Sequence, residues 1–275
     1  MVTLYHISCF YNYNECCFLI LIIMHYSLKK LVGFNIQAID GNIGKINEFY
    51  FDDLSWIIRY TVVNTDNWSL GRNVLISPFS IGIPDMKKQI IPVNLTIDQV
   101  ENSPDIDTSK PVYRQHETEL SKYYKWPLYW TGSDYGGGVF NMNPIPYPEI
   151  IGEKDELTQS EKYLSENSDP HLRSTHQVTD YGIQAIDGEI GHVYDFLINQ
   201  ETWAISYIVV KTKNWLPGKK VLISPHWLKE ISWDEQKVRV NMTIESIKSS
   251  PEYDSSKYEN VEYEGAISTK YGVDE

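Results

Sequence analysis

Cysteine is scarce in this chain of 275 residues and confined to one end. The three cysteines are Cys9, Cys16 and Cys17, so the body of the chain offers no disulfide framework and no cysteine-ligated metal site. The longest apolar run, Cys16–Met24, is nine residues long, whereas a membrane-spanning helix needs about 20. The first basic residue is Lys29, so the run also lacks the positive charge that precedes a secretory signal.

Basic residues are outnumbered as well. The chain has 24 Lys and Arg against 37 Asp and Glu, a net charge of −13 and an isoelectric point near 5.0. Binding to nucleic acid or to anionic lipid depends on clustered basic side chains, so the composition excludes nucleic acid as a partner. An apolar content of 42% with 13% aromatics is enough for folded cores. We expect a cytoplasmic protein of about two domains.

An internal repeat organises the chain. Shifting the sequence by 147 positions aligns 37–110 with 184–257 without a gap, and 32 of these 74 positions are identical. The shared motifs include Gln-Ala-Ile-Asp-Gly at 37–41 and Val-Leu-Ile-Ser-Pro at 74–78. Because the similarity begins just after Met24, the repeat favours a native start at Met24, with a membrane anchor or a disordered extension as alternatives for the residues before it.

Each copy has the pattern of an all-β unit. Short β-branched and aromatic segments alternate with turns such as Asp40-Gly41. One of these segments, 73–77, is closed by Pro78. Pro92 indicates an edge position for the last segment. Thr96 and Gln99 form a capping-box pattern, which predicts a short helix reaching Asn102. Glu117–Trp126 is a further candidate helix, and Trp126 is expected to pack either against a barrel or across the seam between the barrels.

These observations predict all-β with minor α: two small antiparallel β-barrels in tandem, each closed by a short helix. After the candidate helix, residues 126–148 of the segment between the copies mix Pro, Gly and aromatic residues, which cannot propagate a helix or a central strand. The expected organisation is an N-terminal extension at 1–26, barrel 1 at 27–110, a linker at 111–173, barrel 2 at 174–257 and an acidic tail at 258–275.

An Ile-x-x-x-Asp-Gly-x-x-Gly turn followed by Trp-x-Ile-x-Tyr-x-Val-Val resembles the PRC-barrel domain. The matching residues are 36–44 with 56–63 and 183–191 with 203–210. This domain forms the cytoplasmic end of the photosynthetic reaction centre H subunit and occurs in ribosome maturation factors. The resemblance implies a bacterial protein that binds another protein and contacts a membrane only through a membrane complex.

Candidate binding residues lie in the loops that both copies share. Trp68 and Trp215 are large indoles between strands, suited either to closing a barrel or to contacting a partner. Arg72, Lys219 and Lys220 form a basic rim beside them. Asp40 and Asp187 are general-base or cation-ligand candidates, although an Asp-Gly hairpin turn is the favoured explanation for both.

Catalytic and metal motifs are missing. The seven histidines show no metal-ligand spacing, and neither His192 nor His226 recurs in the first copy, where Lys45 and Phe79 stand. The sequence predicts no catalytic residues, no metal and no cofactor. We therefore expect a non-enzymatic interaction or assembly module with a protein partner, and a homo-oligomer remains open.

Two alternatives come from other classes. A reaction-centre-like electron or proton role, or small-ligand binding, would need a cofactor or a polar pocket between the barrels. A hydrolase would need carboxylates in the seam between them.

Overall fold

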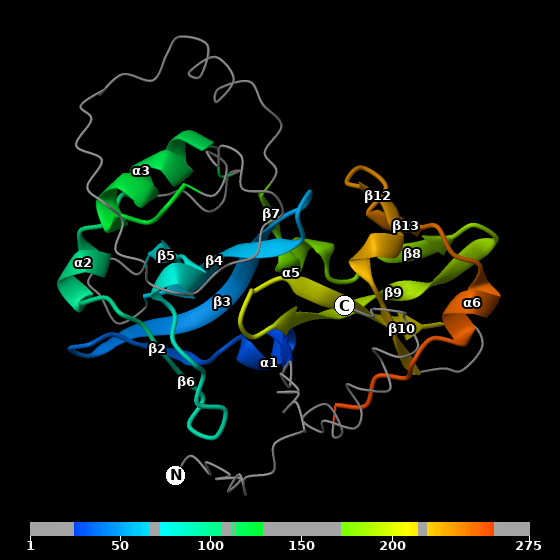
Figure 1. Cartoon of the computed structure of the whole chain (residues 1–275), viewed down its shortest axis with the longest axis horizontal. Coiled ribbons are helices and arrows are strands. Elements are labelled where there is room, and N and C mark those ends of the chain that lie inside the picture. The colour runs from blue at the N-terminus through cyan, green and yellow to red at the C-terminus, as the bar shows by residue number, and fades with distance from the viewer. Residues whose placement is uncertain are drawn as a thin grey trace, which may run out of the picture.

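The structure, a computed structural model, describes residues 25–65, 72–105, 112, 114–128, 172–213 and 219–255. Nearly every element of the first copy recurs about 147 residues later in the second (Figure 1). The first copy contains β1 (His25–Ser27), α1 (Leu28–Leu31), β2 (Asn35–Gln37), β3 (Asn42–Asp52), β4 (Ile57–Asn64), β5 (Asn73–Ile76), η1 (Pro78–Ser80), β6 (Ile90–Pro92) and α2 (Ile97–Glu101).

The second copy repeats this order and adds one strand, β12. Its elements are β7 (Leu172–Ser174), α5 (Thr175–Val178), β8 (Gly182–Ala185), β9 (Gly188–Asn199), β10 (Ile205–Thr212), β11 (Lys220–Ile223), η2 (Pro225–Trp227), β12 (Leu228–Ser232), β13 (Lys237–Val240) and α6 (Ile244–Lys248). The described part of the chain is thus mostly β with few helices, as the sequence predicts, and none of its helices is long and apolar enough to cross a membrane.

The strands form two open sheets, and the expected closed antiparallel barrels are not seen in the described residues. The orders are β5-β4-β3-β2-β6 and β11-β10-β9-β8-β13-β12. Within each sheet one pair is parallel, β2 with β6 and β8 with β13. The chain reverses at every connection from β2 to β6, so that β6 runs in the same direction as β2. An all-antiparallel arrangement was therefore the wrong expectation.

Each copy gives its first strand to the sheet of the other copy. Strand β1 pairs with the end of β9, with Ser27 opposite Leu197. Strand β7 pairs in the same way with the end of β3, with Ser174 opposite Tyr50. The 1–26 extension expected from the sequence thus overlaps β1 at His25 and Tyr26. This reciprocal exchange makes the two copies one interlocked body.

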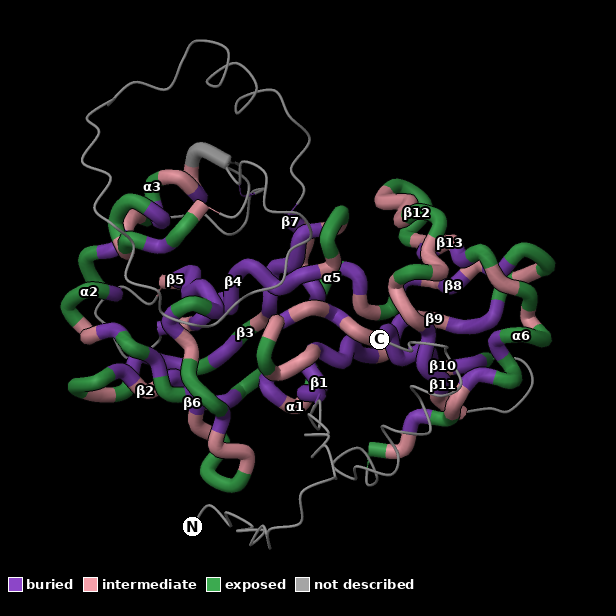
Figure 2. The backbone as a smooth tube through the Cα atoms, viewed as in Figure 1, coloured by how far each residue is buried: buried purple, intermediate pink, exposed green. Residues whose placement is uncertain are grey.

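A pseudo-two-fold axis runs between the copies. Ile57 bridges to Ala204, its counterpart 147 residues later. The N–H of Ile58 donates to the carbonyl of Trp203 at 2.9 Å, and the N–H of Ile205 donates to the carbonyl of Trp56 at 2.7 Å. The larger apolar core runs through both copies, a smaller one lies within the second copy, and the buried stretches of β3, β4, β9 and β10 meet in the middle of the molecule (Figure 2).

Three local predictions are confirmed. Helix α2 begins at the predicted capping box, in which Thr96 and Gln99 satisfy each other's backbone N–H groups, and Asn102 is its C-cap. The candidate helix after the first copy is α3 (Arg114–Tyr124). Trp126, which follows α3, is buried and faces Tyr60 of β4 with 6.4 Å between ring centroids.

Candidate functional site

The two aspartates of the Asp-Gly turns lie at the starts of α2 and α6. Asp40 Oδ1 accepts from the N–H of Ile97 at 2.9 Å, and Asp187 Oδ1 accepts from the N–H of Ile244 at 2.8 Å. A carboxylate that satisfies the free N–H of a helix start is favourable there. Both aspartates therefore stabilise the turn that joins the first hairpin of each copy to its last helix.

Arg72 holds the other end of α2. Its guanidinium donates to the carbonyls of Val100, Glu101 and Ser103 at 2.8–3.2 Å, and it lies 3.6 Å from Asp105. The last carbonyls of a helix have no partner within the helix, and a cation is favourable at that end. The Arg72 guanidinium thus binds the C-terminal carbonyls of α2.

The basic residues of the second copy are placed differently. Lys219, which corresponds to Arg72, lies 3.4 Å from Glu252. The Lys220 ammonium lies 4.0 Å from the centroid of the Tyr194 ring, and the Lys29 ammonium lies 3.8 Å from the same centroid. The structure therefore brings Lys220 together with Lys29 and Tyr194, which sequence reasoning did not single out. Trp68 and Trp215 lie outside the described residues.

A cavity of about 200 Å³ lies between the copies. Helix α1 packs on β9 and helix α5 packs on β3, and the cavity lies among these four elements. Its lining consists of five pairs of equivalent positions and Phe196: Leu28 and Thr175, Lys29 and His176, Val32 and Thr179, Asn47 and Tyr194, Glu48 and Asp195. This cavity exists because the exchanged strands carry α1 and α5 across the axis. We call it the axial cavity.

The two carboxylates of the axial cavity are bonded to the exchanged helices. Ser27, the N-cap of α1, accepts from the N–H of Lys30 and donates its hydroxyl to Asp195 at 2.6 Å. Ser174, the N-cap of α5, donates its hydroxyl to Glu48 in the same way. Each exchanged segment is therefore fastened by a capping serine to a carboxylate of the other copy.

Asp195 is the more deeply buried of these carboxylates. It also accepts from the N–H groups of Lys29 at 3.0 Å and Phe196 at 2.7 Å. Burial raises the pKa of Asp195 above its usual value, while the Ser27 hydroxyl and the two N–H groups act in the opposite direction. Its oxygens are thus occupied by donors of the protein itself.

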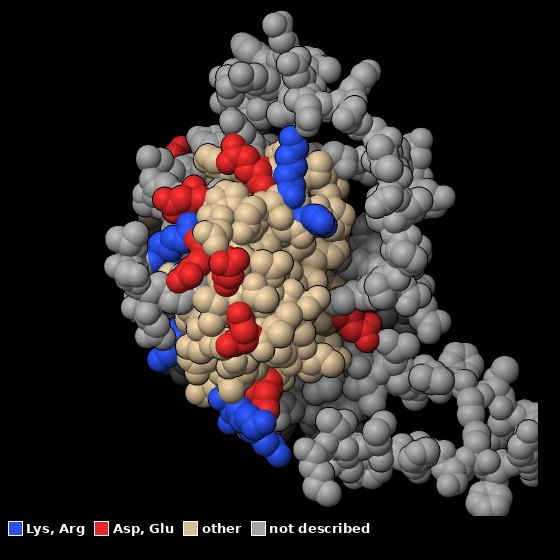
Figure 3. Space-filling view, turned by 90° about the vertical axis from the view of Figure 1, so that its left-hand side faces the viewer, with Lys and Arg blue, Asp and Glu red and all other residues tan. Residues whose placement is uncertain are grey.

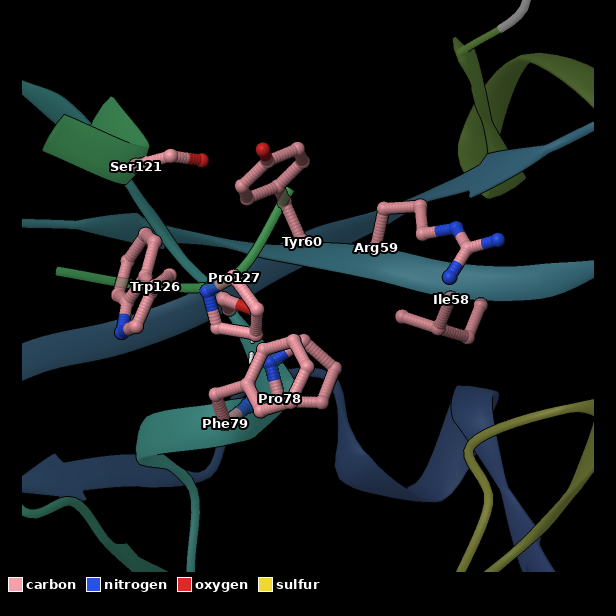
Figure 4. Close-up of a pocket in the computed structure, with 9 residues that line it drawn as sticks. Ile58, Arg59, Tyr60, Pro78, Phe79, Ser121, Trp126 and Pro127 are labelled. Atoms are coloured by element: carbon pink, nitrogen blue, oxygen red, sulfur yellow. Dashed lines mark hydrogen bonds between the residues drawn. The ribbon is translucent and has the colours of Figure 1, made fainter. Parts of the chain in front are cut away.

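A second, smaller cavity lies where the segment after α3 covers β4. Tyr60, Phe79 and Trp126 surround it (Figure 4), and its volume is about 10 Å³. That space holds about one water molecule. The Trp126 indole N–H donates to the Ser80 hydroxyl at 2.9 Å, so this cavity belongs to the packing of the covering segment and is too small for an organic ligand.

Exposed apolar residues mark the turns of the two repeats. Ile39 is 68% exposed and its equivalent Ile186 is 66% exposed. Among the large exposed apolar residues of the described ranges, these two form the pair that recurs at one position of the repeat. The end of the molecule formed by the first copy shows a broad uncharged area between acidic and basic side chains (Figure 3).

The backbone that carries these isoleucines is fixed. The N–H of Ile39 donates to the carbonyl of Leu95, and that of Ile186 donates to the carbonyl of Met242, both at 3.0 Å. A side chain on Gly41 would come within 2.7 Å of Ile97, so the turn lies directly on the helix that Asp40 caps. We call these two turns, 38–41 and 185–188, the tips.

Metal chemistry has no visible site in the part of the chain that the structure describes, where no three His, Cys, Asp or Glu side chains gather as ligands. His192 Nε2 lies 3.9 Å from Asp180 Oδ1. Partial burial of the imidazole lowers the pKa of His192, and the charge of Asp180 acts in the opposite direction.

No signal in the sequence singles out the cavity residues. Positions 28, 29, 32 and 47 differ between the copies, but so do most positions of the alignment. Compared with models of known protein families and with curated proteins, the chain matches none.

Proposed function

We propose that this chain is a non-enzymatic assembly protein of the tandem PRC-barrel type that binds another protein through its two tips. The observation that carries the proposal is the pair of equivalent, exposed isoleucines, Ile39 and Ile186, on backbone fixed by hydrogen bonds. The same apolar side chain is exposed at the same place in both copies, which gives the chain two equivalent contact points for a partner.

The repeated polar residues of the tips support a binding role over a chemical one. Asp40 and Asp187, which a catalytic role would require to face a substrate, accept the first N–H of α2 and α6. The fixed turns favour binding because little conformational freedom is lost when a partner covers them. Burying one isoleucine stabilises a complex by about 2 kcal/mol.

The placement of the tips suggests the form of the complex. The hairpins β2–β3 and β8–β9 point to opposite ends of the molecule (Figure 1), so one small partner domain does not reach both. Two copies of a partner, one at each end, fit this arrangement and the pseudo-two-fold axis. The protein then acts as a bridge that holds two identical partners in fixed relative positions.

Affinity capture from an extract of the source organism tests this proposal. The baits are the unchanged protein, Ile39→Ser, Ile186→Ser and the double variant. Leu54→Ser is the control, because Leu54 is 84% exposed but its equivalent in the second copy is Glu201, so this apolar residue is not repeated. We expect one protein to be enriched by the unchanged and control baits, reduced by each single variant and lost with the double variant.

Two further measurements complete the test. Light scattering of the purified complex should give two partner molecules per chain, and Trp68→Ala with Trp215→Ala tests whether the two tryptophans that the sequence singles out add to the contact. The proposal is refuted if the double variant captures the same proteins as the control, or if the purified chain turns over a substrate.

A further inference from the structure

We propose that the axial cavity is a binding site for a small aromatic carboxylate, independent of the tips. The cavity of about 200 Å³ is smaller than the pockets of 300–1,000 Å³ that hold drug-sized ligands, and it is lined by residues of both copies. It therefore suits a single ring with one charged group.

One wall of the axial cavity is apolar and aromatic. Helix α1 with β9 contributes Leu28, Val32, Tyr194 and Phe196, together with the charged Lys29 and Asp195. Leu28 and Phe196 are buried and form the inner part of this wall, whereas Val32 is 45% exposed at its rim. Flat aromatic rings pack well against such a wall, in stacked or edge-to-face contact with tyrosine and phenylalanine.

The opposite wall is polar. Helix α5 with β3 contributes Thr175, His176, Thr179, Asn47 and Glu48. Equivalent positions of the two copies have thus diverged: Leu28 corresponds to Thr175 in the alignment, and Val32 corresponds to Thr179. The two walls come from equivalent elements but differ in polarity. Such a cavity favours a ligand with a ring on one side and polar atoms on the other.

The charges at the mouth favour an anion. Lys29, which lines the cavity, and Lys220, which lies beside it on the same ring, are both within about 4 Å of the Tyr194 ring centroid, and His176 is exposed at the position equivalent to Lys29. Two carboxylates also belong to the lining, but Asp195 is buried and its oxygens accept from Ser27 and from the N–H groups of Lys29 and Phe196, and Glu48 accepts from Ser174. Hydrogen bonding from Lys220 and the charges of both lysines lower the pKa of Tyr194, in agreement with a positive potential there.

Sodium benzoate is the probe for this site, with benzamide as the uncharged analogue of the same shape. Titration into the full-length protein, followed by methyl NMR, should shift the resonances of Leu28, Val32 and Thr175 to saturation. We expect a dissociation constant on the order of 0.1–1 mM for so small a ligand. Benzamide should bind about tenfold more weakly, because it cannot form the charge-assisted contact.

Variants separate the cavity from the rest of the surface. Val32→Trp fills the cavity from its apolar rim and should abolish saturable binding, and Thr179→Trp should do the same from the equivalent position on the other wall. Leu54→Trp is the control, because it adds the same side chain at an exposed place outside the cavity, and it should bind benzoate like the unchanged protein.

Lys29→Met tests the charge. It should weaken benzoate about tenfold and leave benzamide unchanged, whereas Lys30→Met, one residue along the same helix and not part of the cavity lining, should change neither. The proposal is overturned if benzoate causes no saturable shift at the three methyl-bearing residues, if both filling variants still bind it, or if benzamide binds as tightly as benzoate.

Discussion

Replacing Ser27 by alanine removes the contact that fastens the first strand of the chain to the second copy. The Ser27 hydroxyl caps α1 and donates to Asp195 at 2.6 Å. Loss of a helix cap costs about 1 kcal/mol, and loss of a hydrogen bond to a buried charge costs about 1.5–3 kcal/mol. We therefore expect Ser27→Ala to lower the free energy of unfolding by about 3 kcal/mol.

The equivalent change in the other copy is the matched control. Ser174 caps α5 and donates to Glu48, but Glu48 is partly exposed, so water can replace the lost hydroxyl. Ser174→Ala should cost about 1 kcal/mol, the value of the cap alone. Urea unfolding at 25 °C and pH 7.5, followed by tryptophan fluorescence, measures both values.

The pH dependence gives an independent check. Because burial raises the pKa of Asp195 above the ordinary value of 3.8, the folded state holds this proton more tightly than the unfolded state. The stability that protonation contributes is complete below about pH 3.8 and is lost as the pH rises through the folded pKa. The Ser27 hydroxyl favours the charged form, so the cost of Ser27→Ala should be largest at neutral pH and should shrink on acidification.

Two results would refute this reasoning. Equal losses for Ser27→Ala and Ser174→Ala would show that the burial of Asp195 does not decide the energy. A cost of Ser27→Ala that is the same at pH 4 and pH 7.5 would show that the hydroxyl does not act on the charged carboxylate. Coupling in the double variant Ser27→Ala with Asp195→Asn should be about 1.5 kcal/mol or more.

The remaining predictions concern the residues that bind the ends of α2 and α6 and the glycines at which neighbouring strands approach each other. Asp40→Ala and Asp187→Ala should each cost about 1 kcal/mol in urea unfolding, because each removes an acceptor from a helix start; no loss would show that water serves as well. Arg72→Met should lower stability by about 1–2 kcal/mol and speed hydrogen exchange in α2, since its guanidinium bonds the last carbonyls of that helix; unchanged exchange would contradict the assignment. Gly44→Ala and Gly191→Ala should each prevent folding or cost more than about 3 kcal/mol, because the added carbon would lie 2.0 Å from a carbonyl oxygen of the neighbouring strand. Circular dichroism and thermal melting distinguish these outcomes, and stable, native-like variants would count against the close approach of the strands.

The site residues divide according to how local their interactions are. The cap of α2 and the place of Trp126 are correct predictions, since a capping box and an aromatic residue after a helix act over a few positions or against any nearby apolar face. The role of Asp40 is different, because Asp40 and its partner Ile97 are 57 positions apart. An Asp-Gly turn indicates a hairpin, but no pattern in the sequence says which distant N–H its carboxylate accepts from.

The sequence by itself determines that two related β units lie in this chain, since identical turns and strands recur at one spacing and local preferences fix them. Only the tertiary structure decides that the units exchange their first strands, with Ser27 bonded to Asp195 and Ser174 to Glu48. The physical reason is that a three-residue strand pairs equally well with either copy as far as backbone bonds are concerned. The choice depends on side chains brought together from more than 120 positions apart, and the axial cavity is its consequence.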